Sequence, residues 1–313
     1  MQREPWHNDF PMTPARVAEV IAADLPEFAD PRVAALGEGW DFTTFLVDDA
    51  WVFRFPKRRQ CVRQLTREFK LLEALAAPLA RQSIAIPRYR YHVQKPVLSK
   101  LAYVGYALLP GEPLVECAAH SLDSAAIARQ LGAFLRLLQT TAPTRKPPTY
   151  HDQFPSDLVD FRRELDESSV ALPPLIAEAC RIALGRQPAV DRGPPRFQHG
   201  DLGVEHILVD RRRGEIVSII DWGDAGWGNR IADLVGLWAW GGDAAVRAAL
   251  TTWGQTLGSD DWTRLRQWGI AYAIGSAYYG YKDRRDPLHA TALGWLERMQ
   301  KAGQLADPET PDA

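Results

Sequence analysis

Two aspartates in short motifs are the strongest candidates for chemistry in this 313-residue chain. Asp201 ends the motif His-Gly-Asp, and Asp221 begins the motif Asp-Trp-Gly-Asp. Between them, residues 207–209 and 216–220 are rich in β-branched side chains and predict two strands joined by a charged turn. Asp201 precedes the first strand and Asp221 follows the second, so both should lie at the same end of a hairpin. Two close carboxylates suit a base paired with a ligand of a divalent cation, although Asp221 before Trp-Gly is also compatible with a plain turn residue.

The elements that must position these motifs divide into a β-rich part and a helical part. Thr13-Pro14 is typical of a helix N-cap followed by Pro in the first turn, and the apolar stripe that follows continues to Leu25. Short strands are predicted at residues 32–36, 42–47, 51–55, 96–98 and 103–109, with turns at Gly37–Trp40 and Asp48–Asp49. Apolar residues at helical spacing predict an amphipathic helix from about residue 61 to 77.

The second part begins after Pro110-Gly111-Glu112-Pro113, which breaks the strand pattern and predicts a lobe boundary. Ser121 is the expected N-cap of a helix that carries Ile127 and Leu138. Further helices are expected near residues 156–167 and 173–186, and three or four more from about Ile231. The expected fold class is therefore α+β, with a small β-rich lobe and a larger, mainly helical lobe.

Composition excludes several functional classes. The 37 Lys and Arg residues nearly balance the 39 Asp and Glu residues, giving a net charge of −2, so no basic excess predicts binding to nucleic acid or to a membrane. No apolar run approaches the length of a membrane span. The three cysteines lie far apart in sequence, which favours reduced thiols in a cytoplasmic protein.

The two motifs and their hairpin resemble the catalytic core of the aminoglycoside and macrolide phosphotransferases, a family with the protein-kinase-like two-lobed fold. The segments FQHGDLGVEHILVD and IIDWGDAGWGNRIADL carry the resemblance, together with GEGWDFTTFLVDDAWVFRFPKR near the N-terminus. The N-terminal segment is most similar to the aminoglycoside 2″-phosphotransferase branch. The resemblance implies a nucleotide-binding lobe at residues 1–110 and a catalytic, substrate-binding lobe at residues 111–313. It also implies Mg²⁺ as cofactor, with ATP or GTP as co-substrate.

The resemblance assigns a role to each matching position in the second lobe. Asp201 corresponds to the carboxylate that accepts or orients the proton of the attacking hydroxyl. His206 and Asp221 correspond to the metal ligands, with Asp221 in the place of the DFG aspartate. His199 and Asp233 are expected to hold the catalytic loop through hydrogen bonds.

In the first lobe, the resemblance places Gly37 and Gly39 in a turn over the triphosphate, where small residues let the backbone approach. Arg54 stands where kinases have lysine, and its spacing to Glu68, 68 − 54 = 14, suits a strand-to-helix ion pair. Trp51, Phe53 and Phe55 alternate on one strand face, so Arg54 should point to the other face. Lys57 is the rival candidate for the phosphate-binding cation.

The expected acceptor is a small-molecule antibiotic, an aminoglycoside ahead of a macrolide. Candidate substrate contacts are Asp224, Asp157 and Asp160, because a polycationic ligand needs paired carboxylates when it is desolvated. Tyr279 is a further candidate, as part of an aromatic set suited to line a sugar or macrolide pocket, although core packing is the alternative for most of that set. A solvated helix face is the alternative interpretation of the acids near residues 152–167, where Arg162 and Arg163 also occur. Two other functions stay open: a kinase of a small cellular metabolite, since fold does not fix substrate, and a nucleotide-binding pseudokinase without activity. The expected oligomeric state is a monomer.

Overall fold

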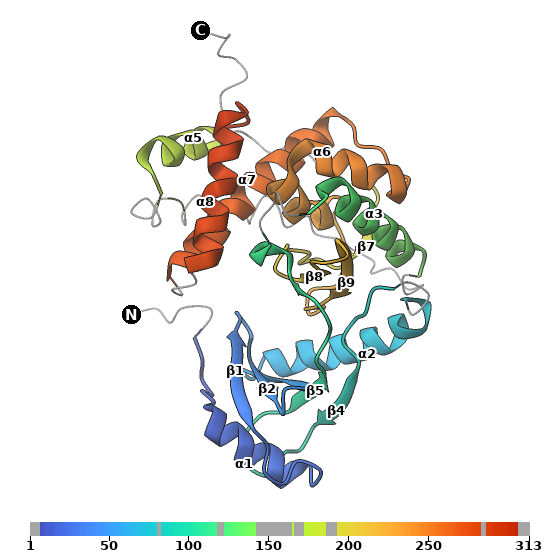
Figure 1. Cartoon of the computed structure of the whole chain (residues 1–313), viewed down its shortest axis with the longest axis vertical. Helices are drawn as coiled ribbons and strands as arrows, with labels where there is room; N and C mark the ends of the chain where they lie inside the picture. Colours follow the sequence, from blue (N-terminus) through green and yellow to red (C-terminus); the bar gives the residue numbers. More distant parts are fainter. Residues whose placement is uncertain are drawn as a thin grey trace. The chain divides into compact units, whose positions relative to one another are not determined.

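The computed structural model describes residues 7–79, 83–117, 122–141, 165, 172–185, 193–282 and 286–305. Backbone contacts divide the chain into two compact units, Met1–Pro110 and Gly111–Ala313 (Figure 1). An antiparallel sheet is the main element of the first unit, whereas helices dominate the second. This arrangement agrees with the α+β class predicted from the sequence.

The first unit is built on a five-stranded sheet in the order β1-β2-β3-β5-β4, with every neighbouring pair antiparallel. Its strands are β1 Val33–Glu38, β2 Phe42–Val47, β3 Trp51–Pro56, β4 Tyr89–Val93 and β5 Tyr103–Ala107. Asp48 and Asp49 join β2 to β3 with φ of 51° and 55°. Two successive residues with positive φ are what a tight hairpin turn requires, so the predicted turn is present.

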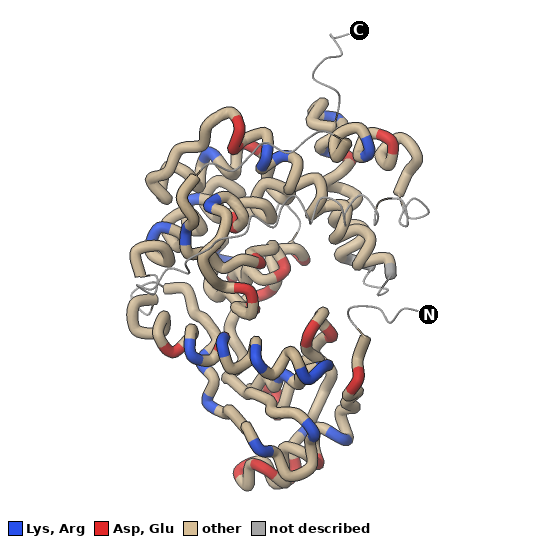
Figure 2. The backbone as a smooth tube through the Cα atoms, turned by 180° about the vertical axis from the view of Figure 1, so that it is seen from behind, with Lys and Arg blue, Asp and Glu red and all other residues tan. Residues whose placement is uncertain are grey.

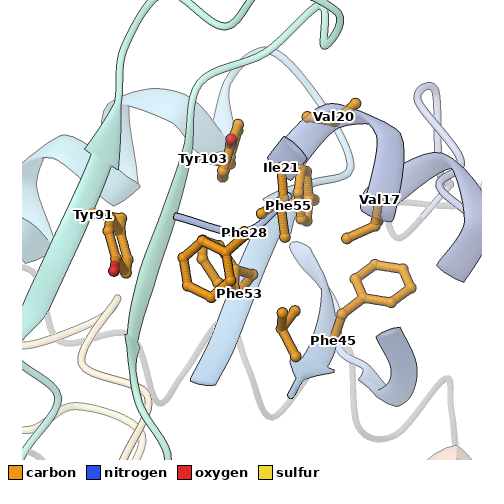
Figure 3. Packing of buried hydrophobic residues seen from close by; sticks show 10 residues of the cluster. Val17, Val20, Ile21, Phe28, Phe45, Phe53, Phe55, Tyr91 and Tyr103 are labelled. Carbon is orange, nitrogen blue, oxygen red and sulfur yellow. The ribbon is translucent and has the colours of Figure 1, made fainter. Parts of the chain in front are cut away.

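Helix α1, Pro14–Asp24, covers one face of this sheet. Thr13 caps it as predicted, because its hydroxyl accepts a hydrogen bond from the Arg16 backbone N–H at 3.3 Å. The apolar stripe of the helix packs against aromatic side chains of the strands (Figure 3). The buried members of this cluster are Val17, Val20, Ile21, Phe28, Phe45, Val47, Phe53, Phe55, Tyr91 and Tyr103.

Helix α2, Cys61–Leu79, covers the opposite face. Its buried residues Cys61 and Leu65 cluster with Val104 of β5, the immediate neighbour of Tyr103 in the first cluster. Since successive strand residues point to opposite faces, α1 and α2 lie on different sides of the sheet. Lys and Arg recur along α2 (Figure 2), and Arg63, Arg67 and Lys70 are exposed.

One predicted strand of this unit was wrong. The structure has β4 at Tyr89–Val93, whereas residues 96–98 form no strand. Tyr91 and Val93 turn inward onto the aromatic cluster. Pro96, by contrast, has no N–H for a ladder, and Val97 is 71% exposed.

The second unit combines two small sheets with helices. Its elements are β6 Glu112–Pro113, η1 Leu114–Glu116, α3 Ser124–Thr140, α5 Pro174–Gly185, β7 Arg196–Gln198, β8 Ile207–Asp210, β9 Glu215–Ile219, β10 Gly226–Gly228, η3 Ala232–Leu234, α6 Val235–Trp253, α7 Ser259–Lys282 and α8 Asp286–Lys301. The predicted hairpin is β8–β9, which pairs with β6, while β7 pairs with β10.

Two further expectations concern the helices of this unit. Asp123, not Ser121, caps α3, because its carboxylate accepts hydrogen bonds from the backbone N–H groups of Ala125 and Ala126. The helix predicted at residues 156–167 lies outside the described residues, apart from Leu165. Within the described ranges, no helix is long and apolar enough to cross a membrane.

Gly105 of β5 provides a test of the packing in the first unit. A Cβ atom at this position would lie 2.5 Å from the Phe53 ring, and this fully buried ring packs against Phe28, Tyr91 and Tyr103. We expect Gly105→Ala to lower the free energy of unfolding by about 1–3 kcal/mol, the usual cost of overpacking. Chemical denaturation would measure it. Gly37→Ala is the matched control, because its Cβ meets nothing within 4 Å; equal stability of the two variants would contradict the packing.

Candidate functional site

The loop that carries Asp201 lies between β7 and β8 and is held by a buried carboxylate. Asp233, 4% exposed, accepts hydrogen bonds from the backbone N–H groups of His199 at 2.8 Å and Gly200 at 2.9 Å. Gly200 has φ of +87°, and a Cβ there would lie 2.4 Å from the Asp224 carbonyl oxygen. Glycine is therefore required where the two motifs touch.

His199 joins the same loop to the segment that carries Asp221. Its imidazole is fully buried, with Nε2 3.0 Å from the Ile220 carbonyl oxygen and Nδ1 3.4 Å from the backbone N of Asp201. A carbonyl only accepts, so Nε2 carries the proton and Nδ1 accepts from the Asp201 N–H. The predicted structural role of His199 and Asp233, holding the loop by hydrogen bonds, is confirmed.

The loop and the hairpin bring together Asp201, His206 and Asp221. His206 Nδ1 lies 2.8 Å from the backbone carbonyl oxygen of Asp201 and 3.6 Å from its carboxylate. His206 Nε2 lies 3.8 Å from the Asp221 carboxylate. Asp221 has φ of 62°, a left-handed conformation that is uncommon for a residue with a side chain and clusters at functional sites. Both aspartates lie at one end of the hairpin, as their positions in sequence predict.

The crowded carboxylates shift the pKa values of this group. Desolvation, together with the charges of Glu205, Asp221 and Asp224, raises the pKa of the Asp201 carboxyl to about 7, while His206 opposes the shift. Because 47% of the Asp201 side chain is exposed, water screens part of this effect. Burial disfavours the charged form of His206, but the carboxylates of Asp201, Glu205 and Asp221 outweigh it and raise the His206 pKa to about 9.

Asp221 and His206 fit a site for Mg²⁺ that takes few ligands from the protein. The carboxylate is the hard oxygen ligand that Mg²⁺ prefers. With its pKa raised to about 9, His206 is protonated on both ring nitrogens near pH 7, so Nε2 must lose its proton before it can ligate a metal. The hydrogen bond from Nδ1 to the Asp201 carbonyl would then keep Nε2 toward Asp221, as in metal-binding histidines oriented by a second hydrogen bond. The described residues contain no group of three or more His, Cys, Asp or Glu placed to hold a metal alone. Mg²⁺ usually binds through one or two carboxylates together with substrate phosphates and several waters, and the Asp221 carboxylate is of the type that such a site uses.

The sequence analysis missed Glu205 and its contact with Tyr272. The Tyr272 hydroxyl of α7 donates a hydrogen bond to the Glu205 carboxylate at 2.5 Å, and the Tyr272 ring stacks on Trp295 of α8. Helices α7 and α8 thereby brace the loop that carries Asp201 next to His206. Glu205 adjoins a predicted ligand, which was an available signal, but its contact with a tyrosine 67 residues later has no local signature.

The first unit contains the predicted ion pair between β3 and α2. Arg54 Nη1 contacts both carboxylate oxygens of Glu68, at 2.8 and 3.0 Å, and also the Tyr89 hydroxyl at 3.0 Å. The guanidinium lies over the Phe42 ring, 4.3 Å from its centroid. Arg54 is 5% exposed and Glu68 is fully buried, so the charged pair is desolvated and held from several sides.

The glycines and Lys57 lie at the turn between β1 and β2. Gly37 belongs to β1, and Gly39 follows this strand. Neither has a positive φ, and a Cβ at Gly37 would meet nothing within 4 Å, so the fold itself does not demand glycine at position 37. Lys57, just after β3, contacts the Gly39 carbonyl oxygen at 3.1 Å and the Glu38 carboxylate at 2.9 Å.

The proposed substrate contacts fall in different places. Asp224 lies in the loop before β10, and its backbone packs on Gly200. Tyr279 is half-buried in α7, about two turns after Tyr272. Asp157 and Asp160 lie outside the described residues.

Comparison with known proteins places this geometry in a family. The model of the APH phosphotransferase enzyme family matches residues 32–268. The GDP and kanamycin complex of APH(2″)-IIIa is 23% identical, with a TM-score of 0.68, and the match covers 91% of this chain and 98% of that one. The apoenzyme of macrolide 2′-phosphotransferase MphH from Brachybacterium faecium is 20% identical, with a TM-score of 0.55 and coverage of 96% and 100%.

A third solved structure, the streptomycin–ATP–APH(2″)-IIa ternary complex, is 17% identical, with a TM-score of 0.59 and coverage of 94% and 99%. At these identities the likeness shows the fold, and it confirms the predicted fold class. The family match confirms the resemblance stated from the motifs. A comparison with curated proteins gave no match.

His199 yields a prediction about stability and pH. Burial, followed by the charge of His206, lowers the His199 pKa to about 3. The unfolded chain binds a proton near the ordinary value of about 6.5, so the contribution of His199 to stability is present above that pH and is lost as the pH falls toward 3. We expect a loss of up to about 1.4 kcal/mol for each pH unit below 6.5.

Denaturation from pH 7 to 5 on the wild type and on His199→Gln would isolate this effect. Gln does not titrate, so the variant should be less stable at pH 7 yet show a shallower decline toward acid. Parallel pH profiles of the two proteins would contradict a neutral buried His199.

Proposed function

Because the chain belongs to the phosphotransferase enzyme family, and is therefore a phosphotransferase, we propose that it transfers the γ-phosphate of ATP or GTP to a hydroxyl group of an aminoglycoside antibiotic. Modification of this kind is a resistance function. The observation that carries the proposal is the arrangement of Asp201, His206 and Asp221 at one end of the β8–β9 hairpin. It joins a carboxylate suited to a base with a partial site for a divalent cation.

Asp201 is the proposed catalytic residue. Its carboxylate accepts or orients the proton of the acceptor hydroxyl while the hydroxyl oxygen attacks the γ-phosphorus. The hydrogen bonds of Asp233 and His199 fix the backbone from which it projects. Mg²⁺ held by Asp221 and His206 would neutralise charge on the phosphate oxygens.

Nucleotide binding is assigned to the first unit, Met1–Pro110, and acceptor binding to the second, Gly111–Ala313. Arg54 is the proposed phosphate-binding cation, because the Glu68 carboxylate, the Tyr89 hydroxyl and the Phe42 ring fix its guanidinium. A fixed cation stabilises developing charge without the cost of reorganisation. The turn at Gly37 and Gly39 is the proposed contact of the backbone with the triphosphate.

An aminoglycoside is favoured as acceptor by the carboxylates that gather around Asp201. Glu205 and Asp224 both act on the Asp201 carboxyl electrostatically, and the proposed reaction needs neither of them as base or metal ligand. Ammonium groups of a polycationic acceptor would compensate such charges. Asp224, Asp157, Asp160 and Tyr279 remain proposed contacts. A macrolide is the second candidate acceptor, because the half-buried Tyr279 and its aromatic neighbours in α7 offer apolar surface.

The proposed site of action is the cytoplasm. Cys61, Cys117 and Cys180 are all buried and free in the structure. Unpaired cysteines are typical of proteins in reducing compartments, where nucleoside triphosphates are also available as phosphate donors.

Replacement of the proposed base separates chemistry from binding. Asp201→Asn keeps the size of the side chain but removes its basicity, so turnover should fall by about 10²–10⁴-fold. Calorimetry with Mg²⁺ and nucleotide should give nearly the wild-type affinity, because Asp201 is not a proposed nucleotide ligand. Near-wild-type turnover would remove Asp201 from the mechanism.

The acceptor class is tested with kanamycin- and gentamicin-type substrates against erythromycin-type ones, using mass spectrometry to detect a product one phosphate heavier. Exposed ion pairs are screened over about 8–10 Å at physiological salt, so KM for a polycationic acceptor should rise with salt. KM for a macrolide, bound mainly by apolar burial, should change little. Turnover of macrolides alone would transfer the assignment to that class, and turnover of neither would leave a metabolite kinase.

A further inference from the structure

Three consecutive carbonyl groups at the tip of the β1–β2 hairpin are bound by two residues just after β3. Lys57 Nζ donates to the Gly39 carbonyl at 3.1 Å, and the Lys57 backbone N–H donates to the Asp41 carbonyl at 2.8 Å. Arg58 Nη1 donates to the Trp40 carbonyl at 3.2 Å. The hairpin tip is thus anchored through its own peptide groups to the segment that ends β3.

The side chains of the tip are bound by the same two cations. Lys57 Nζ lies 2.9 Å from the Glu38 carboxylate, and Arg58 forms an ion pair with Asp41. The side chain of Lys57 is 5% exposed, although that of Glu38 is 53% exposed. A lysine buried to this degree, with a carbonyl and a carboxylate within reach, is committed to the loop rather than extended into solvent.

We propose that Lys57 and Arg58 are positioning residues that hold the tip, residues 38–41, in the shape that receives the triphosphate, and that Lys57 is not itself a phosphate ligand. This inference rests on the proposed nucleotide-binding function of the first unit. Glycine-containing turns lose much conformational freedom when they become ordered. Anchoring the tip before binding removes that entropic cost from nucleotide association. It also fixes the peptide dipoles that face a ligand, and fixed dipoles are the effective ones.

The test compares three equivalent substitutions in the full chain: Lys57→Met, Arg58→Met and Arg63→Met. Arg63 is an exposed cation on α2, so its replacement changes the charge equally without touching the tip. Hydrogen exchange of the backbone amides is measured without nucleotide. The amides of Gly39 and residue 57 report directly, because Gly39 N–H donates to the Phe42 carbonyl and Lys57 N–H to the Asp41 carbonyl.

We expect exchange at these amides to accelerate by about tenfold in Lys57→Met and Arg58→Met, the effect of losing one hydrogen bond to a charged group, and to stay at the wild-type rate in Arg63→Met. In assays with an acceptor that the wild-type protein phosphorylates, the KM for the nucleotide should rise in Lys57→Met and Arg58→Met, while kcat changes little. Lys57→Arg, which keeps a charged donor, should restore part of the protection. If Lys57→Met fails to fold, the test uses Arg58→Met alone. The Arg58 side chain is 11% exposed, against 5% for Lys57, so its replacement disturbs the fold less.

Unchanged exchange in the nucleotide-free variants would overturn the proposal. So would a loss of affinity in Lys57→Met that grows from nucleoside to diphosphate to triphosphate while exchange stays the same, because that pattern belongs to a direct phosphate ligand. The exchange measurement needs no acceptor. If the wild-type protein phosphorylated none of the acceptors, this would count against the proposed function. The exchange rates of the variants would still test whether Lys57 and Arg58 hold the tip.

Discussion

The hydrogen bonds made by buried Asp233 and His199 are the constraint on which the positions of Asp201 and Asp221 depend. Asp233 fixes the backbone N–H groups before Asp201, and His199 ties the same loop to the carbonyl before Asp221. The two aspartates come from separate segments, and their side chains are partly exposed, at 47% and 41%. The hydrogen bonds of Asp233 and His199 to the backbone therefore contribute to fixing both segments at one end of the hairpin. Fully satisfied buried polar groups rigidify such a region, whereas one lost partner leaves a costly buried group.

In the first unit, too, a buried carboxylate fixes another group, here the cation of Arg54. Glu68 is buried beneath the sheet and binds Arg54, which Phe42 and Tyr89 also contact. A buried ion pair adds little net stability, yet removal of one partner costs about 3–5 kcal/mol because the other charge is left uncompensated. The pair therefore fixes the position of Arg54 more than it stabilises the fold. In each unit a buried carboxylate thus fixes the position of a candidate functional residue: Asp233 fixes the loop of Asp201, and Glu68 fixes Arg54.

Local signals explain which features the sequence predicted. The Thr13 cap, the Asp48–Asp49 turn and the alternation of Trp51, Phe53 and Phe55 depend on neighbouring residues, and each is present in the structure. The Arg54–Glu68 pair was implied by the family resemblance, and its spacing and the strand alternation agreed with it. Features that depend on tertiary packing could not be predicted from the sequence. Strands β7 and β10 have three residues each, and Gly226-Trp227-Gly228 contains two glycines that weaken any strand signal. The contact of Glu205 with Tyr272 depends on how α7 and α8 pack, which no spacing reveals. Lys57 could be named as a cation, but its commitment to Gly39 and Glu38 appears only in three dimensions.

Charge pairing in the first unit explains why the shape of the hairpin tip matters. Arg54, Lys57 and Arg58 pair with Glu68, Glu38 and Asp41 respectively, so the cluster of three cations and three carboxylates carries no net charge. Attraction by excess positive charge is therefore a weak source of affinity for a triphosphate in this cluster. For the proposed nucleotide, directed interactions within the first unit would have to supply it: peptide dipoles held in a fixed orientation and the oriented Arg54 guanidinium. Dipoles stabilise charge only when they need not reorient. A neutral but rigid loop can thus bind phosphate well. If Lys57 and Arg58 no longer held it, the loop would lose this fixed orientation, and Glu38 and Asp41 would lose their cationic partners.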